Sequence, residues 1–115
     1  MTDIQKLTEK ILKFRADRDW EQFHNPKDMA LSLVLEAAEV LEHFQWKNGE
    51  EIDGHVSAAR AAIGEELADV LHWVLLMAHD LDIDIAVALE EKLVKNGLKY
   101  PVEKARGRAT KYNSL

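Results

Sequence analysis

Two pairs of acidic residues carry the first chemical signal in the chain, because the members of each pair are three positions apart. Glu36 and Glu39 form the first pair, and Glu66 and Asp69 form the second. Residues at this spacing project from the same side of an α-helix. Two antiparallel helices joined by a short connection could therefore bring the four carboxylates together. Such pairs also occur on solvated helix faces, so the spacing alone leaves both interpretations open.

The residues around these acids favour a covered site. On each predicted helix the acidic strip is bordered by apolar residues on both sides, such as Leu33 and Leu35 beside Glu36. Carboxylates that share a partly buried pocket repel one another and cannot all stay ionised without a counter-charge. A divalent cation removes this conflict. Oxygen ligands without thiolates favour a hard ion, so we expect Mg²⁺, with Mn²⁺ as the other possibility.

Aromatic and basic residues add a second signal. Trp20 and Trp46 flank the first acid-bearing helix, and Trp73 lies on the acidic face of the next one. Tryptophan can stack on a nucleobase, but it is equally suited to core or interface packing. Near the C-terminus, a basic and amide set falls on one side of a helix, provided that the helix continues past the glycine at position 97: Lys92, Asn96 and Lys99. These residues suit a phosphate group, or simply a solvated helix end.

The elements that must position these residues are helices. Apolar residues recur at helical spacing over residues 3–16, 26–46, 57–80 and from 82 or 84 to 97, and no segment alternates with the period of a strand. Asn25 and Pro26 are typical of an N-cap followed by the first helical residue, and residues 48–54 are expected to form a polar loop. The sequence therefore predicts an all-α fold, a four-helix bundle-like subunit. Because several helices are apolar on two sides, we expect the subunit to assemble into a homo-oligomer.

Composition excludes several classes of protein. The 115 residues correspond to one domain, 1–115, with a basic tail from about residue 101 to 115. Without cysteine there is no disulfide framework, thiolate metal site or cysteine nucleophile. A formal net charge of −6 disfavours a nucleic acid polymer as partner, because phosphate backbones select basic surfaces. No apolar signal region or membrane span is evident, so a cytoplasmic location is expected.

The ordered set of motifs resembles a known family. Glu36-x-x-Glu39, 26 intervening residues and Glu66-x-x-Asp69 are similar to the signature of the all-α nucleoside triphosphate pyrophosphohydrolases. Within these the chain is most similar to MazG-like proteins and their dCTP pyrophosphatase branch. The resemblance extends to RDWEQFHNPKD before the first acidic pair, and to EHFQWK, EELADVL and KNGLKYPVEKARG further along the chain.

This resemblance implies a function. It implies Mg²⁺-dependent hydrolysis of (deoxy)nucleoside triphosphates, dCTP or related and modified pyrimidine dNTPs, to the monophosphate and pyrophosphate by a homodimer or homotetramer. The implied metal ligands are Glu36, Glu39, Glu66 and Asp69. Trp20 and Trp46 would form the base pocket, to which we add Trp73, and the phosphate contacts would be Lys92, Asn96 and Lys99. Hydrolysis needs an activated water, and we assign the proton acceptor to Glu39.

Two alternatives remain open at this level. A carboxylate-bridged di-iron or di-manganese bundle requires Glu-x-x-His on two helices. Asp69-x-x-His72 matches this motif in part. On the other helix, His43 follows Glu39 by four positions and not by the three that the motif requires. A non-enzymatic helical oligomerisation module would instead place the acids at the rim of a subunit interface.

Overall fold

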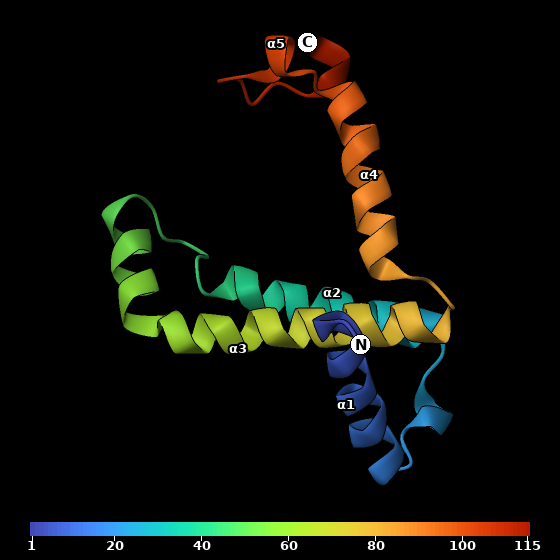
Figure 1. Cartoon of the computed structure of the whole chain (residues 1–115). Coiled ribbons are helices and arrows are strands. Elements are labelled where there is room, and N and C mark those ends of the chain that lie inside the picture. The colour runs from blue at the N-terminus through green and yellow to red at the C-terminus, as the bar shows by residue number, and fades with distance from the viewer. The chain divides into compact units, whose positions relative to one another are not determined.

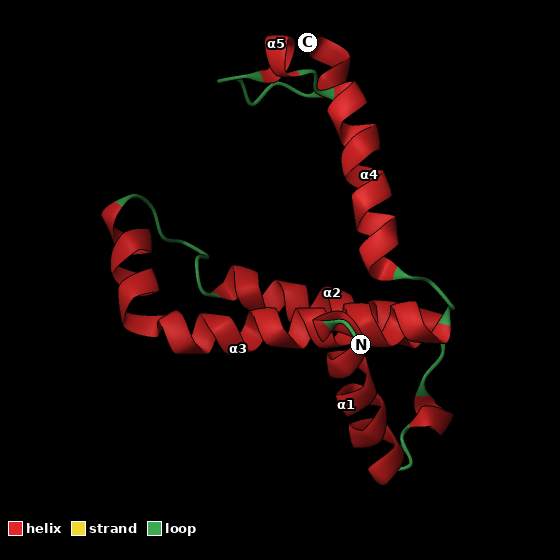
Figure 2. Ribbon diagram, viewed as in Figure 1, coloured by secondary structure: helices red, strands yellow, loops and turns green.

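Every regular element of the protein is helical (Figure 2). The computed structural model describes residues 1–115, and the predicted all-α class is confirmed. The elements are α1 (Asp3–Asp17), η1 (Glu21–Phe23), α2 (Pro26–Glu42), α3 (Glu50–Asp80), α4 (Ile85–Lys99), α5 (Val102–Ala105) and η2 (Tyr112–Ser114). The chain forms two compact parts, Met1–Asp82 and Ile83–Leu115, each described by itself. The four-helix bundle arrangement, the single domain and the homo-oligomer stay predictions. None of the helices combines the length and the apolar character that crossing a membrane requires.

Side-chain caps determine where α1, α2 and α4 begin, and the first of them is Thr2, whose hydroxyl accepts from the backbone N–H of Gln5. The Asn25 side chain accepts a hydrogen bond from the backbone N–H of Asp28 at 3.0 Å, and Pro26 occupies the first turn, as the sequence predicts. Asp84 caps α4 in the same way through the N–H of Val87. Each cap satisfies a backbone donor that has no partner within the helix.

In the first part of the chain, α2 and α3 run side by side in opposite directions, and α1 crosses α3 (Figure 1). Their shared core is small: the buried apolar residues are Met29, Leu75, Leu76 and Ala78. The buried end of α3 therefore contributes most of this core. This pairing of α2 with α3 is the feature that positions the two acidic pairs.

Two predicted boundaries are wrong, both in the connection between the acid-bearing helices. The helix predicted to reach residue 46 ends at Glu42. Residues 43–46 form turns, and Trp46 has a left-handed φ of 68°, which lies outside the α-helical range. The segment predicted as a loop is helical from Glu50, where three acidic residues in the first turn complement the helix dipole. The predicted start near residue 57 corresponds to a kink, since Ala59 has non-helical φ and ψ of −116° and 21°. Figure 1 shows the short first stretch of α3 turning away from the rest.

In the second part, α4 continues through residue 97 to Lys99. The condition for placing the basic and amide set on one side of a helix is therefore met. The chain after α4 forms a short helical turn, α5, and then returns, so that Tyr112 packs edge-on against Tyr100 with ring centroids 6.0 Å apart. The Lys99 ammonium lies 4.8 Å from the Tyr112 ring centroid, which is a cation–π contact.

Candidate active site

The two acidic pairs meet between α2 and α3. Glu36 and Glu39 come from α2, and Glu66 and Asp69 come from α3. One oxygen from each of the four carboxylates lies within 4.8 Å of the others. We call these four residues the acidic cluster. It arises because the 3-residue spacing puts each pair on one helix side and the antiparallel packing turns those sides toward each other.

Two members of the acidic cluster have a carboxylate oxygen that makes no hydrogen bond within the protein. Oε2 of Glu36 and Oε2 of Glu66 are both buried and have no hydrogen-bond partner. A buried carboxylate oxygen without a partner is costly, since burial removes the water that would solvate it. The other two members, Glu39 and Asp69, remain exposed. An all-oxygen donor set with inner oxygens that lack partners fits a hard divalent cation.

The electrostatics of the acidic cluster agree with this fit. The pKa of Glu66 is raised to about 7, first because protonated Glu66 can share a hydrogen bond with Glu39, and then through burial and the neighbouring charges. Burial, followed by the charges of Glu39 and Asp69, also raises the pKa of Glu36. Without a cation, the cluster therefore holds protons near neutral pH that a cation would displace.

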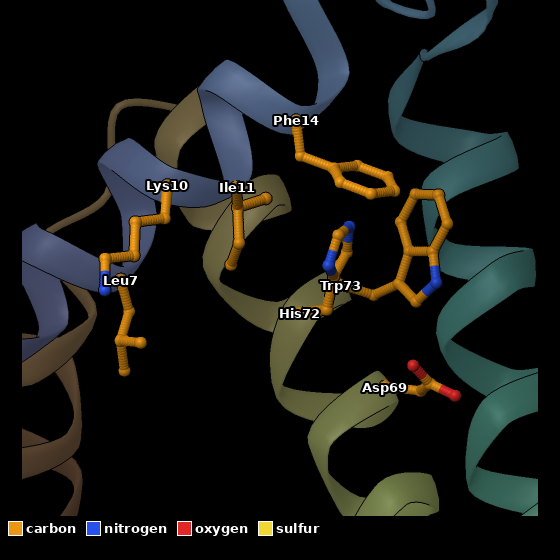
Figure 3. A pocket seen from close by; sticks show the side chains of 7 residues that line it. All are labelled: Leu7, Lys10, Ile11, Phe14, Asp69, His72 and Trp73. Carbon is orange, nitrogen blue, oxygen red and sulfur yellow. The ribbon is translucent and has the colours of Figure 1, made fainter. Parts of the chain in front are cut away.

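A pocket of about 450 Å³ adjoins the acidic cluster through Asp69. It lies between α1 and α3 (Figure 3), and its walls are mainly apolar and aromatic: Leu7, Lys10, Ile11, Phe14, Asp69, His72 and Trp73. The His72 ring stands edge-on to both Phe14 and Trp73, with centroids 6.2 and 5.5 Å apart. A pocket of this size and lining suits a flat organic group beside a charged centre.

Comparison with known proteins identifies the family to which the sequence of this chain is similar. Residues 31–115, most of the chain, match the MazG-like family. The chain belongs to the MazG-like family. It is 40% identical over 117 residues to dCTP pyrophosphatase 1 of Mus musculus, a match that covers 100% of this chain and 67% of that protein. The protein of the same name from Homo sapiens is 39% identical over 117 residues, with 100% and 67% covered.

A solved structure supports the same relationship. A pyrophosphatase from Archaeoglobus fulgidus superimposes with a TM-score of 0.84 at 33% identity, covering 88% of this chain and 94% of that one. The predicted resemblance to MazG-like proteins is confirmed. The expected enzyme class, a nucleoside triphosphate pyrophosphohydrolase, is supported by the same family and relatives.

The structure of this MazG-like chain brings only some of the predicted substrate residues to the site. Trp73 lines the pocket. Trp20 contacts the pocket residue Phe14 edge-on, with ring centroids 5.8 Å apart. Trp46 lies in the connection after α2 and is 89% exposed, and it does not line the pocket. The remaining predicted contacts, Lys92, Asn96 and Lys99, belong to the second part of the chain. The roles of all these residues stay predictions.

Sequence reasoning missed one wall of the pocket. Leu7, Ile11 and Phe14 recur at helical spacing on α1, which is a signal for a covered face but not for a cavity. Their partners on α3 lie more than fifty positions away in the chain. Only the crossing of α1 over α3 turns this apolar stripe into a pocket wall.

Proposed function

We propose that this MazG-like chain is a Mg²⁺-dependent hydrolase of deoxynucleoside triphosphates, with dCTP or a related or modified pyrimidine dNTP as its substrate. The products are the monophosphate and pyrophosphate. The observation that carries the proposal is the acidic cluster, whose four carboxylates converge within 4.8 Å while two buried oxygens lack partners. The curated relatives, which are named for dCTP, support the choice of base.

Glu36, Glu39, Glu66 and Asp69 would hold the cation, which is proposed to be Mg²⁺, with Mn²⁺ as a substitute. When bound, this cation supplies charge neutralisation for the triphosphate and polarises its phosphoryl oxygens. Glu36 and Glu66 would provide the buried oxygens, and the exposed Glu39 and Asp69 would face the substrate. A cluster made of carboxylates without a histidine supports Mg²⁺ over the di-iron alternative.

Glu39 is proposed as the general base. Its carboxylate accepts a proton from a water molecule as the water oxygen forms a bond to the α-phosphorus. The bond between the α-phosphorus and the oxygen that bridges to the β-phosphorus breaks, and pyrophosphate leaves with the electron pair. Glu39 suits this role because it is exposed to water, whereas Glu36 and Glu66 each hold a buried oxygen.

The pocket beside Asp69 is proposed to take the nucleobase. The nucleobase would lie against flat aromatic rings and an aliphatic side chain, from Phe14, Trp73 and Ile11. Trp20 and Trp46 complete the proposed base contacts. The phosphates are assigned to Lys92, Asn96 and Lys99, as the family resemblance implies. Nucleic acid polymers and membranes are not proposed as partners, and a cytoplasmic location is proposed.

A homodimer or homotetramer is proposed as the working assembly. Large apolar side chains on the acid-bearing helices are more than half exposed, including Val34 at 64%, Leu35 at 63% and Leu67 at 54%. Large apolar side chains exposed on both acid-bearing helices favour association with a second copy. Light scattering after gel filtration is expected to give twice or four times the subunit mass, and a monomer would contradict the assembly.

The activity is tested with purified protein, Mg²⁺ and each of the four common dNTPs, with pyrophosphate and orthophosphate measured separately. Pyrophosphate should form fastest from dCTP and not at all in EDTA. Replacing the base, Glu39→Gln, should lower kcat by about 100- to 10,000-fold. The matched control is Glu65→Gln, an exposed carboxylate on α3 that lies outside the acidic cluster and should change little. Release of orthophosphate alone, or no turnover, would overturn the proposal.

A further inference from the structure

A partly buried ion pair joins the end of α1 to the end of α3, outside the acidic cluster. Arg15 is 5% exposed, and its Nη1 and Nη2 donate to the two carboxylate oxygens of Asp80 at 2.7 and 2.9 Å. His79 adds a third contact, from Nδ1 to Asp80 Oδ1 at 3.0 Å. The guanidinium beside Asp80 holds the pKa of that carboxyl below its ordinary value. None of the proposed chemistry uses this pair.

The same guanidinium reaches a histidine in the connection between α1 and α2. Nη1 of Arg15 lies 3.4 Å from Nδ1 of His24. Arginine has only donors, so His24 must accept at Nδ1 and carry its ring hydrogen on Nε2. Arg15 thereby selects one tautomer and one orientation of the His24 ring, because the two hydrogen bonds to Asp80 fix the plane of the guanidinium group.

His24 then meets the wall of the pocket. Its ring stands edge-on to the indole of Trp73, with centroids 5.3 Å apart and planes inclined by 69°. Trp73 is one of the residues that line the pocket beside Asp69 (Figure 3). A continuous set of contacts therefore runs from Asp80 through Arg15 and His24 to the aromatic wall.

A role in stability alone accounts poorly for this arrangement. Burying an arginine and a carboxylate costs desolvation energy, and well-packed apolar residues in their place are often equally stable. What an ion pair adds is directional geometry, because two parallel hydrogen bonds fix the plane of the guanidinium. The group that receives this geometry is His24, and His24 contacts only one residue of the pocket wall by ring packing, Trp73.

We propose that Arg15 and Asp80 are positioning residues that set base specificity: they orient His24, which holds the Trp73 indole at the edge of the pocket. This inference rests on the proposed function in one respect, that the pocket takes the nucleobase. Held in this orientation, the Trp73 indole presents a fixed surface to the base, and bases of different size and shape are discriminated by their contact with it. Releasing Trp73 removes this fixed surface and weakens the discrimination.

The first experiment follows Trp73 directly and needs no catalytic activity. Phe in place of Trp20 and Trp46, which are 44% and 89% exposed, leaves Trp73 as the sole tryptophan. In this background, Asp80→Asn and His24→Asn should each shift the Trp73 emission to the red and increase its quenching by acrylamide. His24→Asn leaves the ion pair intact, so it keeps the test valid if Asp80→Asn fails to fold.

The matched control comes from the same helix. Lys13 and Asp17 form an exposed ion pair on α1, with Nζ to Oδ2 at 2.7 Å and 76% and 54% of the side chains exposed. Asp17→Asn removes one carboxylate of an ion pair without touching the pocket, and it should leave the Trp73 emission at the wild-type position.

The second experiment measures specificity in the otherwise unsubstituted protein. For Asp80→Asn and His24→Asn, the KM for dCTP should rise roughly fivefold to tenfold while kcat changes by less than about twofold, because binding geometry is lost and the acidic cluster is not. The ratio of kcat/KM between dCTP and dATP should fall by a similar factor. Mg²⁺ affinity from calorimetry should match wild type.

The outcomes separate this inference from the proposed function. Folded variants with wild-type Trp73 emission and wild-type dCTP to dATP ratio would overturn the positioning role. A wild-type protein that hydrolyses no dNTP would overturn the proposed function and, with it, the claim of base specificity. In that case the emission of Trp73 still decides whether Arg15 and Asp80 position the indole.

Discussion

Glu36 on α2 and Glu66 on α3 each have one carboxylate oxygen that is buried and has no hydrogen-bond partner, and both belong to a cluster whose oxygens converge within 4.8 Å. Two acids in this relationship destabilise the metal-free fold, because like charges repel and each oxygen has lost its water. A cation bound as proposed would satisfy both oxygens at once.

Divalent cations should stabilise the folded chain measurably. At a Mg²⁺ concentration 100 times the dissociation constant, linkage adds about 2.7 kcal/mol to the free energy of unfolding. The thermal midpoint measured by circular dichroism should rise accordingly with Mg²⁺, and the rise should disappear in Glu36→Gln. Glu65→Gln, which alters an exposed acid beside the cluster, should keep the full response. An equal rise in Glu36→Gln would contradict the metal site.

The metal-free protein should lose stability as the pH rises toward neutrality. The pKa of Glu66 is raised to about 7 in the fold, against an ordinary value of 4.5. Between these values the folded state binds more protons than the unfolded state, so the free energy of unfolding falls as the pH rises from about 4.5 to 7. Urea titrations in EDTA at several pH values measure this slope. Glu66→Gln should flatten it, and a flat wild-type profile would refute the raised pKa.

Breaking the pair of Arg15 and Asp80 should cost much more stability than breaking an exposed pair. Asp80→Asn leaves the buried Arg15 guanidinium without its counter-charge, which lowers the free energy of unfolding by about 1–3 kcal/mol. The exposed pair offers the comparison, since Asp17→Asn should cost less than about 1 kcal/mol. Because Arg15 lowers the pKa of Asp80, this stabilisation is present above pH 3.8 and is lost as the pH falls through the folded value. Equal losses in the two variants, measured in urea, would contradict the larger contribution of the Arg15–Asp80 pair.

Trp73 should matter for nucleotide binding and not for the cation. Stacking of an aromatic side chain on a base contributes about 1–3 kcal/mol. Trp73→Ala should therefore weaken binding of a non-hydrolysable dCTP analogue by a corresponding factor in calorimetry. Mg²⁺ affinity should be unchanged, because the acidic cluster is made of carboxylates from other positions. A variant that lost both affinities together would indicate general damage to the fold.

The local features of this chain were predictable because they depend on neighbours in the sequence. The cap at Asn25 and Pro26 satisfies its own helix, and the spacing within each acidic pair follows from the helical repeat. The motif that resembles MazG-like proteins is also local, and the family match confirms it. One long-range feature, the meeting of Glu36 with Glu66, was predictable because a short connection favours antiparallel packing of consecutive helices.

Other features were decided only by the tertiary structure. The polar run after Trp46 did not show that α2 ends at Glu42 or that α3 begins at Glu50, since turn and helix compete closely in such a segment. The contact of Arg15 with Asp80 spans 65 positions and lacks any local signature. The pocket beside Asp69 likewise exists only because α1 crosses α3. Helical periodicity predicts which residues share one face of a helix. Which other element packs against that face depends on packing and charge burial summed over the whole fold.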